Sequence, residues 1–167
     1  LDRDESLIAV ESERPKSHAA SAAPAKGELG KAAVKYRELF TRFLEGEPVE
    51  KEAPVPRDLD RRAVDIKGCA YFMDASQVGI CHIPDNAWLD GADPVAGHDH
   101  AVVMLFEHPR LPDADNLARG WVEGAVDASY EMRGLEIGAC VSGHMRQMGF
   151  DTRIHVPGAQ LLDLDRL

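Results

Sequence analysis

An unbroken apolar run, HAVVMLFEH at residues 100–108, is the feature that most restricts how this chain can fold. The run is one strand long, contains neither Gly nor Pro, and shows no alternation of apolar and polar side chains. Such a strand is typical of a sheet that is covered on both faces. The run therefore predicts a central strand in a domain with structure on each side of its sheet.

A second strand and two helices can be placed around this run. DIKGCAYFMDAS at 65–76 is typical of a short helix, and QVGICHIP at 77–84 predicts a strand whose middle is buried. From Leu117 onward, apolar residues recur at the spacing of a long helix. Gly149 can adopt the left-handed conformation that closes this helix. DTRIHV at 151–156 predicts a returning strand. The apolar stripe of the long helix consists of Leu117, Trp121, Ala125, Ala128, Met132, Leu135 and Ala139.

Composition divides the chain into four parts. Residues 1–28 have no sustained apolar periodicity and are expected to form a disordered tail. Residues 29–46 predict an amphipathic helix, residues 47–56 carry three prolines and predict an extended linker, and residues 57–167 predict an α+β domain. Because the chain begins with Leu and stops where helical spacing has just resumed, we expect a truncated piece of a longer protein.

Charge and hydropathy exclude several classes of partner. With 29 acidic against 19 basic residues, the net charge of −10 would repel a nucleic acid unless the basic side chains were gathered on one face. No basic patch is evident in the sequence. No apolar run approaches the roughly 20 residues of a membrane span, and the N-terminal stretch lacks the apolar region of a secretory signal. The sequence therefore predicts a soluble, cytoplasmic protein that binds neither nucleic acid nor membrane.

The three cysteines match no disulfide framework, and we expect them to be reduced. Cys69, Cys81 and His82 offer metal ligands, but zinc sites usually pair cysteines two to four residues apart, and no such pair exists here. The sequence favours Cys69 on the inner face of a helix and Cys81 within a strand, both as small core residues.

Two further groups of residues could hold a ligand. His98, His100 and His108 flank the apolar strand and could bind a cation at the edge of the sheet, although exposed loop histidines would give the same pattern. Gly120 and Gly124 lie four residues apart and form a smooth helix ridge. Such a ridge allows close packing of another backbone, or less often the approach of a cofactor.

No catalytic residue can be assigned from the sequence. Ser76, Ser129 and Ser142 all lie outside a G-x-S-x-G motif, and no glycine-rich phosphate loop is present. Ser142 is better explained as a helix residue whose hydroxyl bonds its own backbone.

Three stretches together resemble one known family. IKGCAYFMDASQVGICHIPDNAW at 66–88, HAVVMLFEHP at 100–109 and HMRQMGFDTRIHVPGA at 144–159 are similar to the N-terminal part of catabolic, cobalamin-dependent reductive dehalogenases, which are related to epoxyqueuosine reductases. The resemblance covers about two thirds of the chain, from Arg57 onward. The matching positions are Ala75, Val78, Gly79, Ile80, Arg146, Gly149, Phe150 and Arg153.

The resemblance implies a nitroreductase-like or corrinoid-core-like sheet packed by helices, incomplete at its C-terminus. It implies cobalamin, 4Fe-4S clusters and a catalytic tyrosine for the full-length protein. The cysteines here do not match the C-x2-C-x2-C-x3-C-P runs of those clusters, so no cofactor is expected in this piece. The resemblance therefore implies an inactive N-terminal domain that packs against the C-terminal catalytic half of the same polypeptide. The alternatives are a nitroreductase-like or corrinoid-binding domain that retains its cofactor, and a small metal-binding module.

Overall fold

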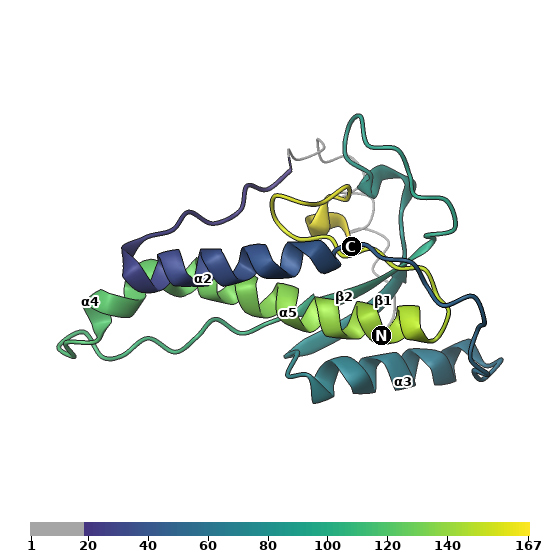
Figure 1. Cartoon of the computed structure of the whole chain (residues 1–167), viewed down its shortest axis with the longest axis horizontal. Coiled ribbons are helices and arrows are strands. Elements are labelled where there is room, and N and C mark those ends of the chain that lie inside the picture. The colour runs from purple at the N-terminus through teal and green to yellow at the C-terminus, as the bar shows by residue number, and fades with distance from the viewer. Residues whose placement is uncertain (1–18) are drawn as a thin grey trace, which may run out of the picture.

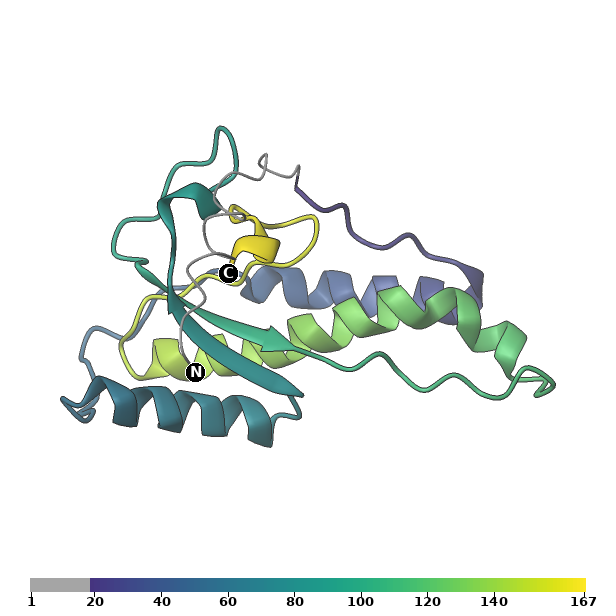
Figure 2. The ribbon, with the colours of Figure 1, turned by 180° about the vertical axis from the view of Figure 1, so that it is seen from behind.

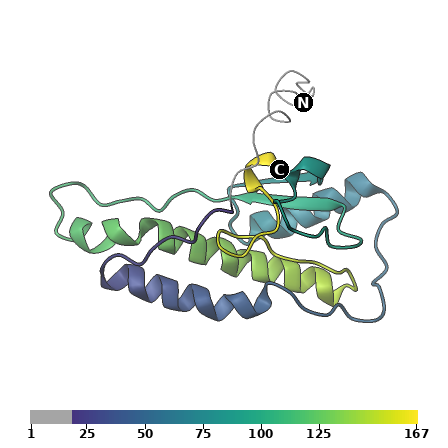
Figure 3. The ribbon, with the colours of Figure 1, turned by 90° about the horizontal axis from the view of Figure 1, so that it is seen from above.

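The computed structural model describes residues 19–167 and has helices packed on one face of a small sheet (Figure 1). Helix α2 (Gly27–Phe40) lies along α5 (Val126–Gln147), and α3 (Leu59–Phe72) lies beside the C-terminal half of α5. A short helix, α4 (Arg119–Val122), precedes α5 at the far end of this pair (Figure 3). The predicted α+β class is confirmed.

Helix α3 is bounded by local signals at both ends. The Asp58 carboxylate accepts hydrogen bonds from the backbone N–H groups of Asp60 at 3.0 Å and Arg61 at 3.3 Å, which caps the first turn. After the last turn, Asp74 takes a left-handed conformation with φ of 76°, and the N–H of Ala75 returns to the carbonyl of Ala70 at 3.0 Å. The chain leaves the helix already directed into the first strand.

Helix α5 closes at Gly149 as the sequence predicts. The φ of Gly149 is 89°, and the N–H of Phe150 donates to the carbonyl of Met145 at 3.1 Å. A Cβ atom at this position would lie only 2.7 Å from Cα of Glu52, so the backbone approach also requires glycine.

The sheet consists of β1 (Gln77–His82) and β2 (His100–Leu105), paired antiparallel with Gln77 opposite Leu105 and His82 opposite His100. Both predicted strands are confirmed. The expectation that β2 is a central strand is wrong for residues 19–167, since β1 is its sole partner there. The two strands pack against helices on one face (Figure 2), and no helix of residues 19–167 covers the other face.

The predicted returning strand at 151–156 does not form. This segment is extended, but the N–H of Ile154 donates to the carbonyl of Leu44 at 2.9 Å, in the turn after α2. Extended backbone becomes a strand only where a ladder partner is available, and here the segment lies against the α2 side of α5.

The inner face of the sheet forms the core with α3 and α5. Ala70, Ala75 and Val78 are buried with Ile137 and Val141 of α5. The hydrophobic side chains of β2 that pack against this cluster are only partly buried. They are Val102 and Met104.

The expected disordered tail, residues 1–28, falls into two portions. Residues 1–18 lie outside the described residues. Residues 19–26 are extended and anchored, because the Glu131 carboxylate of α5 accepts from the N–H of Ala23 at 3.0 Å, and the N–H of Gly158 donates to the carbonyl of Ala20 at 2.7 Å. Helix α2 begins at Gly27, two residues before the expected boundary. Backbone contacts of this kind leave no trace in apolar periodicity.

No helix within residues 19–167 combines the length and the apolarity that crossing a bilayer would require.

Candidate interaction surface

The three cysteines occupy three different environments. Cys140 is exposed, whereas Cys69 and Cys81 are half-buried. The buried position of α3 is Ala70, one residue further along, so Cys69 lies at the boundary of the core instead of inside it. Burial raises the pKa of the Cys81 thiol, whose Sγ lies 3.6 Å from the carbonyl of Leu167.

Two of the histidines singled out in the sequence have separate acidic partners. Nε2 of His98 lies 3.2 Å from a carboxylate oxygen of Asp151, and Nδ1 of His100 lies 2.7 Å from Asp99. The hydrogen bond from His100 lowers the pKa of Asp99. The ring of His100 also lies over that of His82 on the neighbouring strand, with centroids 4.0 Å apart.

His108 has an aromatic partner instead of an acidic one: its ring stacks on Tyr130 of α5, with centroids 4.6 Å apart. In residues 19–167 no three His, Cys, Asp or Glu side chains gather as a metal site would require. The structure therefore brings no ligand set together from His98, His100 and His108.

The glycine ridge meets another backbone. A Cβ at Gly124 would lie 3.2 Å from the carbonyl oxygen of Lys26, and a Cβ at Gly30 would lie 3.2 Å from the carbonyl oxygen of Gly124. The start of α2 thus crosses the chain between α4 and α5 at a point where only glycine fits. Gly120 faces open space. Gly124 therefore serves the packing of α2 against the chain that precedes α5.

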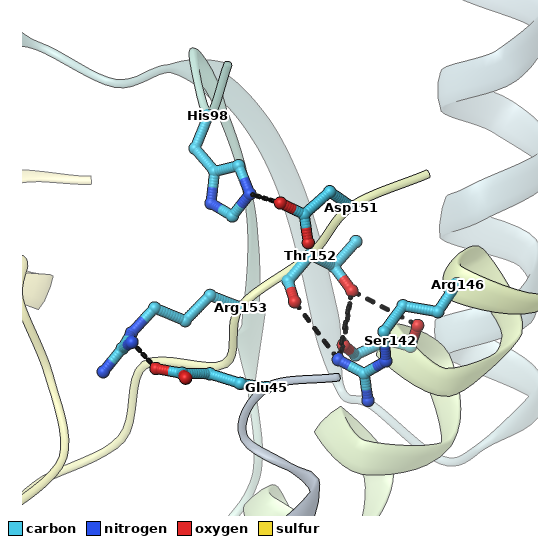
Figure 4. A network of polar contacts seen from close by, with 7 residues as sticks. All are labelled: Glu45, His98, Ser142, Arg146, Asp151, Thr152 and Arg153. Carbon is cyan, nitrogen blue, oxygen red and sulfur yellow. Dashed lines mark hydrogen bonds and ion pairs between the residues drawn. The ribbon is translucent and has the colours of Figure 1, made fainter. Parts of the chain in front are cut away.

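Arg146 is the centre of a polar network that sequence analysis missed (Figure 4). Its guanidinium donates to Ser142 Oγ at 2.7 Å, to the carbonyl of Thr152 at 3.1 Å and to the carbonyl of Phe43 at 3.1 Å. The hydroxyls of Ser142 and Thr152 are themselves 2.7 Å apart, so the side chain of Ser142 bonds across to the next segment, contrary to expectation. The only signal in the sequence was the Arg-x-x-Gly-aromatic pattern that ends the helix.

This network fixes the linker between α2 and α3 to the end of α5. The N–H of Val49 donates to the carbonyl of Arg146 at 3.0 Å, and that of Ala53 donates to the carbonyl of Met148 at 2.9 Å. Nearby, Arg153 pairs with Glu45 (Figure 4). The predicted linker at 47–56 is thus held at several points, which makes a rigid frame behind α3 and α5.

An apolar groove runs between α3 and α5, on the side away from α2. Its volume is about 630 Å³. On its α3 wall, Phe72 is 88% exposed and Val64, two turns earlier on the same helix face, is 63% exposed, so two large apolar side chains of this wall lie in water. The residues that line the groove include Val64, Cys69, Phe72, Cys140, Val141 and His144.

A second apolar surface is the outer face of the sheet. Pairing places Gly79, Cys81, Val103 and Leu105 on the face opposite the core. Leu105 is 54% exposed, and a hollow of about 420 Å³ lies over these residues. A one-sided sheet in contact with water normally has polar residues on its outer face. Here that face is apolar except for Gln77 at the start of β1.

Comparison with known proteins identifies the class. No protein-family model and no curated protein matches the chain. Among solved structures, the N-terminally tagged catabolic reductive dehalogenase NpRdhA is 35% identical, with a TM-score of 0.79 over 92% of this chain. A reductive dehalogenase structure described as suggesting a mechanism for B12-dependent dehalogenation gives 35% identity and a TM-score of 0.80. Tagged NpRdhA in complex with 3-bromo-4-hydroxybenzoic acid gives 35% and 0.79.

The chain is therefore related to reductive dehalogenases, as its motifs predict. NpRdhA is one such enzyme, and the fold of this chain matches part of it. The chain spans 22% of the length of these structures.

Proposed function

We propose that this chain is a non-catalytic domain of a cobalamin-dependent reductive dehalogenase, an oxidoreductase that removes halogen from halogenated aromatic compounds. Its role is to pack against the cobalamin-binding half of the same polypeptide and help to shape it. The complete domain is nitroreductase-like, and cobalamin and the iron-sulfur clusters belong to the remaining part. The relation to NpRdhA supports the enzyme class, and the NpRdhA complex with a bromohydroxybenzoate suggests the class of substrate.

The apolar groove between α3 and α5 is the observation that carries this proposal. A side chain such as Phe72 stabilises an interface by roughly 1.5 to 3 kcal/mol when it is removed from water. Left in water, it gives the isolated chain a surface prone to association. The rigid frame behind the groove keeps its two walls in place without a partner.

The groove does not fit a corrinoid. That cofactor carries amide side chains around its ring, and these need hydrogen-bonding partners in addition to an apolar wall. The polar side chains lining the groove are Asp65 and His144. Two polar groups cannot satisfy the amides of such a ring, which argues against the alternative of a domain that retains cobalamin.

The test is to express residues 1–167 and the remainder of the full-length protein as separate polypeptides and to measure their association. Phe72→Asp should weaken binding at least tenfold, since the loss of one buried aromatic side chain exceeds about 1.4 kcal/mol. Leu117→Asp is the matched control, because Leu117 is also 88% exposed but lies before α4, far from the groove. It should change binding less than about twofold.

Two results would contradict the proposal. One is the absence of association between the two polypeptides. The other is stoichiometric binding of hydroxocobalamin to residues 1–167 in gel filtration, which would indicate a domain that retains its cofactor.

A further inference from the structure

Strand β1 has one edge that no strand covers within residues 19–167. The N–H of Ile83 donates to the carbonyl of Asp99 at 2.9 Å, and in an antiparallel pair such bonded positions alternate along the strand. Gly79 and Cys81 therefore direct their backbone groups toward β2. Val78, Ile80 and His82 direct theirs outward. The close approach of the rings of His82 and His100 fits this assignment, because side chains are nearest at non-bonded pairs.

The outward backbone groups are largely open. The N–H of Val78 donates to the Tyr71 hydroxyl at 3.3 Å, a long bond from a side chain that is itself half exposed. Among residues 19–167, no partner of this kind stands opposite Ile80. The hollow over the outer face extends along this edge and includes Tyr71 and the β1 residues from Gln77 to Cys81.

In the part of the chain that the structure describes, this edge also lacks the devices that protect exposed strands from pairing. Proteins place lysine, proline, a bulge or a covering loop at such an edge. The sequence of β1 is QVGICH, with no proline and no lysine or arginine, and its register with β2 has no bulge. An unprotected apolar edge is expected where another strand belongs.

We propose that the free edge of β1 takes up a strand from the cobalamin-binding half, so that the two parts of the enzyme share one sheet. This inference rests on the proposed function and specifies how the two parts join. Main-chain hydrogen bonds to Ile80 and His82 fix the register, and the apolar outer face beside Cys81 and Leu105 receives alternate side chains of the incoming strand.

Two observations favour this occupant over a second copy of the chain. The carbonyl of Leu167 lies 3.6 Å from Sγ of Cys81, so the last described residue already lies against β1. In addition, the chain carries a net charge of −10, and two copies edge to edge would repel each other.

Hydrogen exchange at single amides tests the proposal without any mutation. The amides of Ile80 and His82 should exchange at least about 100-fold more slowly in the full-length enzyme than in residues 1–167 alone. The amides of Gly79 and Cys81 are the internal control, because they bond to β2 and should be protected in both. NMR suits the 18.3 kDa chain, and mass spectrometry with residue-resolving fragmentation suits the enzyme.

A pair of variants in the separated polypeptides provides a second measurement. Ile80→Pro removes the outward N–H and should weaken their association about tenfold, whereas Ile80→Ala shortens the side chain and keeps the N–H. The proposal expects the proline variant to bind at least threefold more weakly than the alanine variant.

The outcomes separate this proposal from the one on which it rests. If the two polypeptides associate through Phe72 but the Ile80 amide stays fast in the full-length enzyme, the strand pairing is refuted and the domain function remains. If the two polypeptides do not associate, the proposed role of the domain in packing against the cobalamin-binding half is refuted as well. Slow exchange of Ile80 in the isolated chain, together with a dimer in sedimentation, would assign the edge to a second copy and overturn the proposal.

Discussion

Replacing Arg146 by methionine tests whether the polar network beside α5 holds the domain together. Arg146 is 7% exposed and donates to Ser142, Thr152 and Phe43. Methionine keeps the aliphatic stem and removes the guanidinium. Ser142 and Thr152 can then bond each other, but the backbone carbonyls of Thr152 and Phe43 lose a charged donor. Two part-buried acceptors that lose this donor cost up to about 1 to 3 kcal/mol each.

A second effect of the Arg146→Met substitution offsets part of this loss of stability. No carboxylate accepts a hydrogen bond from Arg146 among the described residues, so removing the buried charge also removes its desolvation cost. The expected net loss is about 2 to 4 kcal/mol in the free energy of unfolding, measured by urea denaturation followed by circular dichroism. Arg133→Met is the matched control, because Arg133 lies on the same helix, is 40% exposed and pairs with Asp74. It should cost less than about 1 kcal/mol. A loss at Arg146 no larger than that at Arg133 would refute the reasoning.

Three further predictions concern titration, thiol access and the N-terminal anchor. Burial lowers the pKa of His155 from 6.5 to about 4, so the folded state loses stability as pH falls from 6.5 toward 4. After discounting for solvent contact the loss is about 1 to 2 kcal/mol, and it should be absent in His155→Asn when stability is measured against pH. A thiol reagent should label Cys140 first and Cys81 last, because burial raises the pKa of the Cys81 thiol, and the order should vanish in denaturant. Glu131→Gln should cost about 2 kcal/mol in urea unfolding by leaving Arg37 without its ion-pair partner.

The elements with strong local signals were predictable. The stretch 65–84 predicts a helix and a strand, and both form, although α3 begins earlier, at Leu59, after its cap Asp58. Gly149 ends the long helix in a left-handed conformation, which lets the N–H of Phe150 bond to Met145. The start of that helix was predicted less well. Gly124 interrupts the apolar stripe where the start of α2 crosses it, and a crossing between distant segments cannot be deduced from spacing along one of them.

The polar network and the docked segment at 19–26 could not be predicted for a related reason. Arg146 bonds to the carbonyl oxygens of Thr152 and Phe43, and Glu131 accepts from the backbone N–H of Ala23. Every residue supplies such backbone groups, so no residue type marks the partner. The sequence identified Arg146 as part of a motif, and only the fold gives the motif its structural role.

The error in placing β2 is informative about function. The run HAVVMLFEH predicts a strand covered on both faces and flanked by neighbours. Within residues 19–167, β2 has one neighbouring strand, and on its outer face Leu105 is 54% exposed and Val103 is half-buried. A strand that is apolar on both faces is fully buried only between two layers of structure. Residues 19–167 supply a layer on one of its faces. The composition of β2 therefore indicates an environment more enclosed than the one that these residues provide. The free edge of β1 belongs to the sheet and the groove beside Phe72 to the helices packed on it. A single partner that added a strand beside β1 and covered the outer face of the sheet would account for the apolar character of β2.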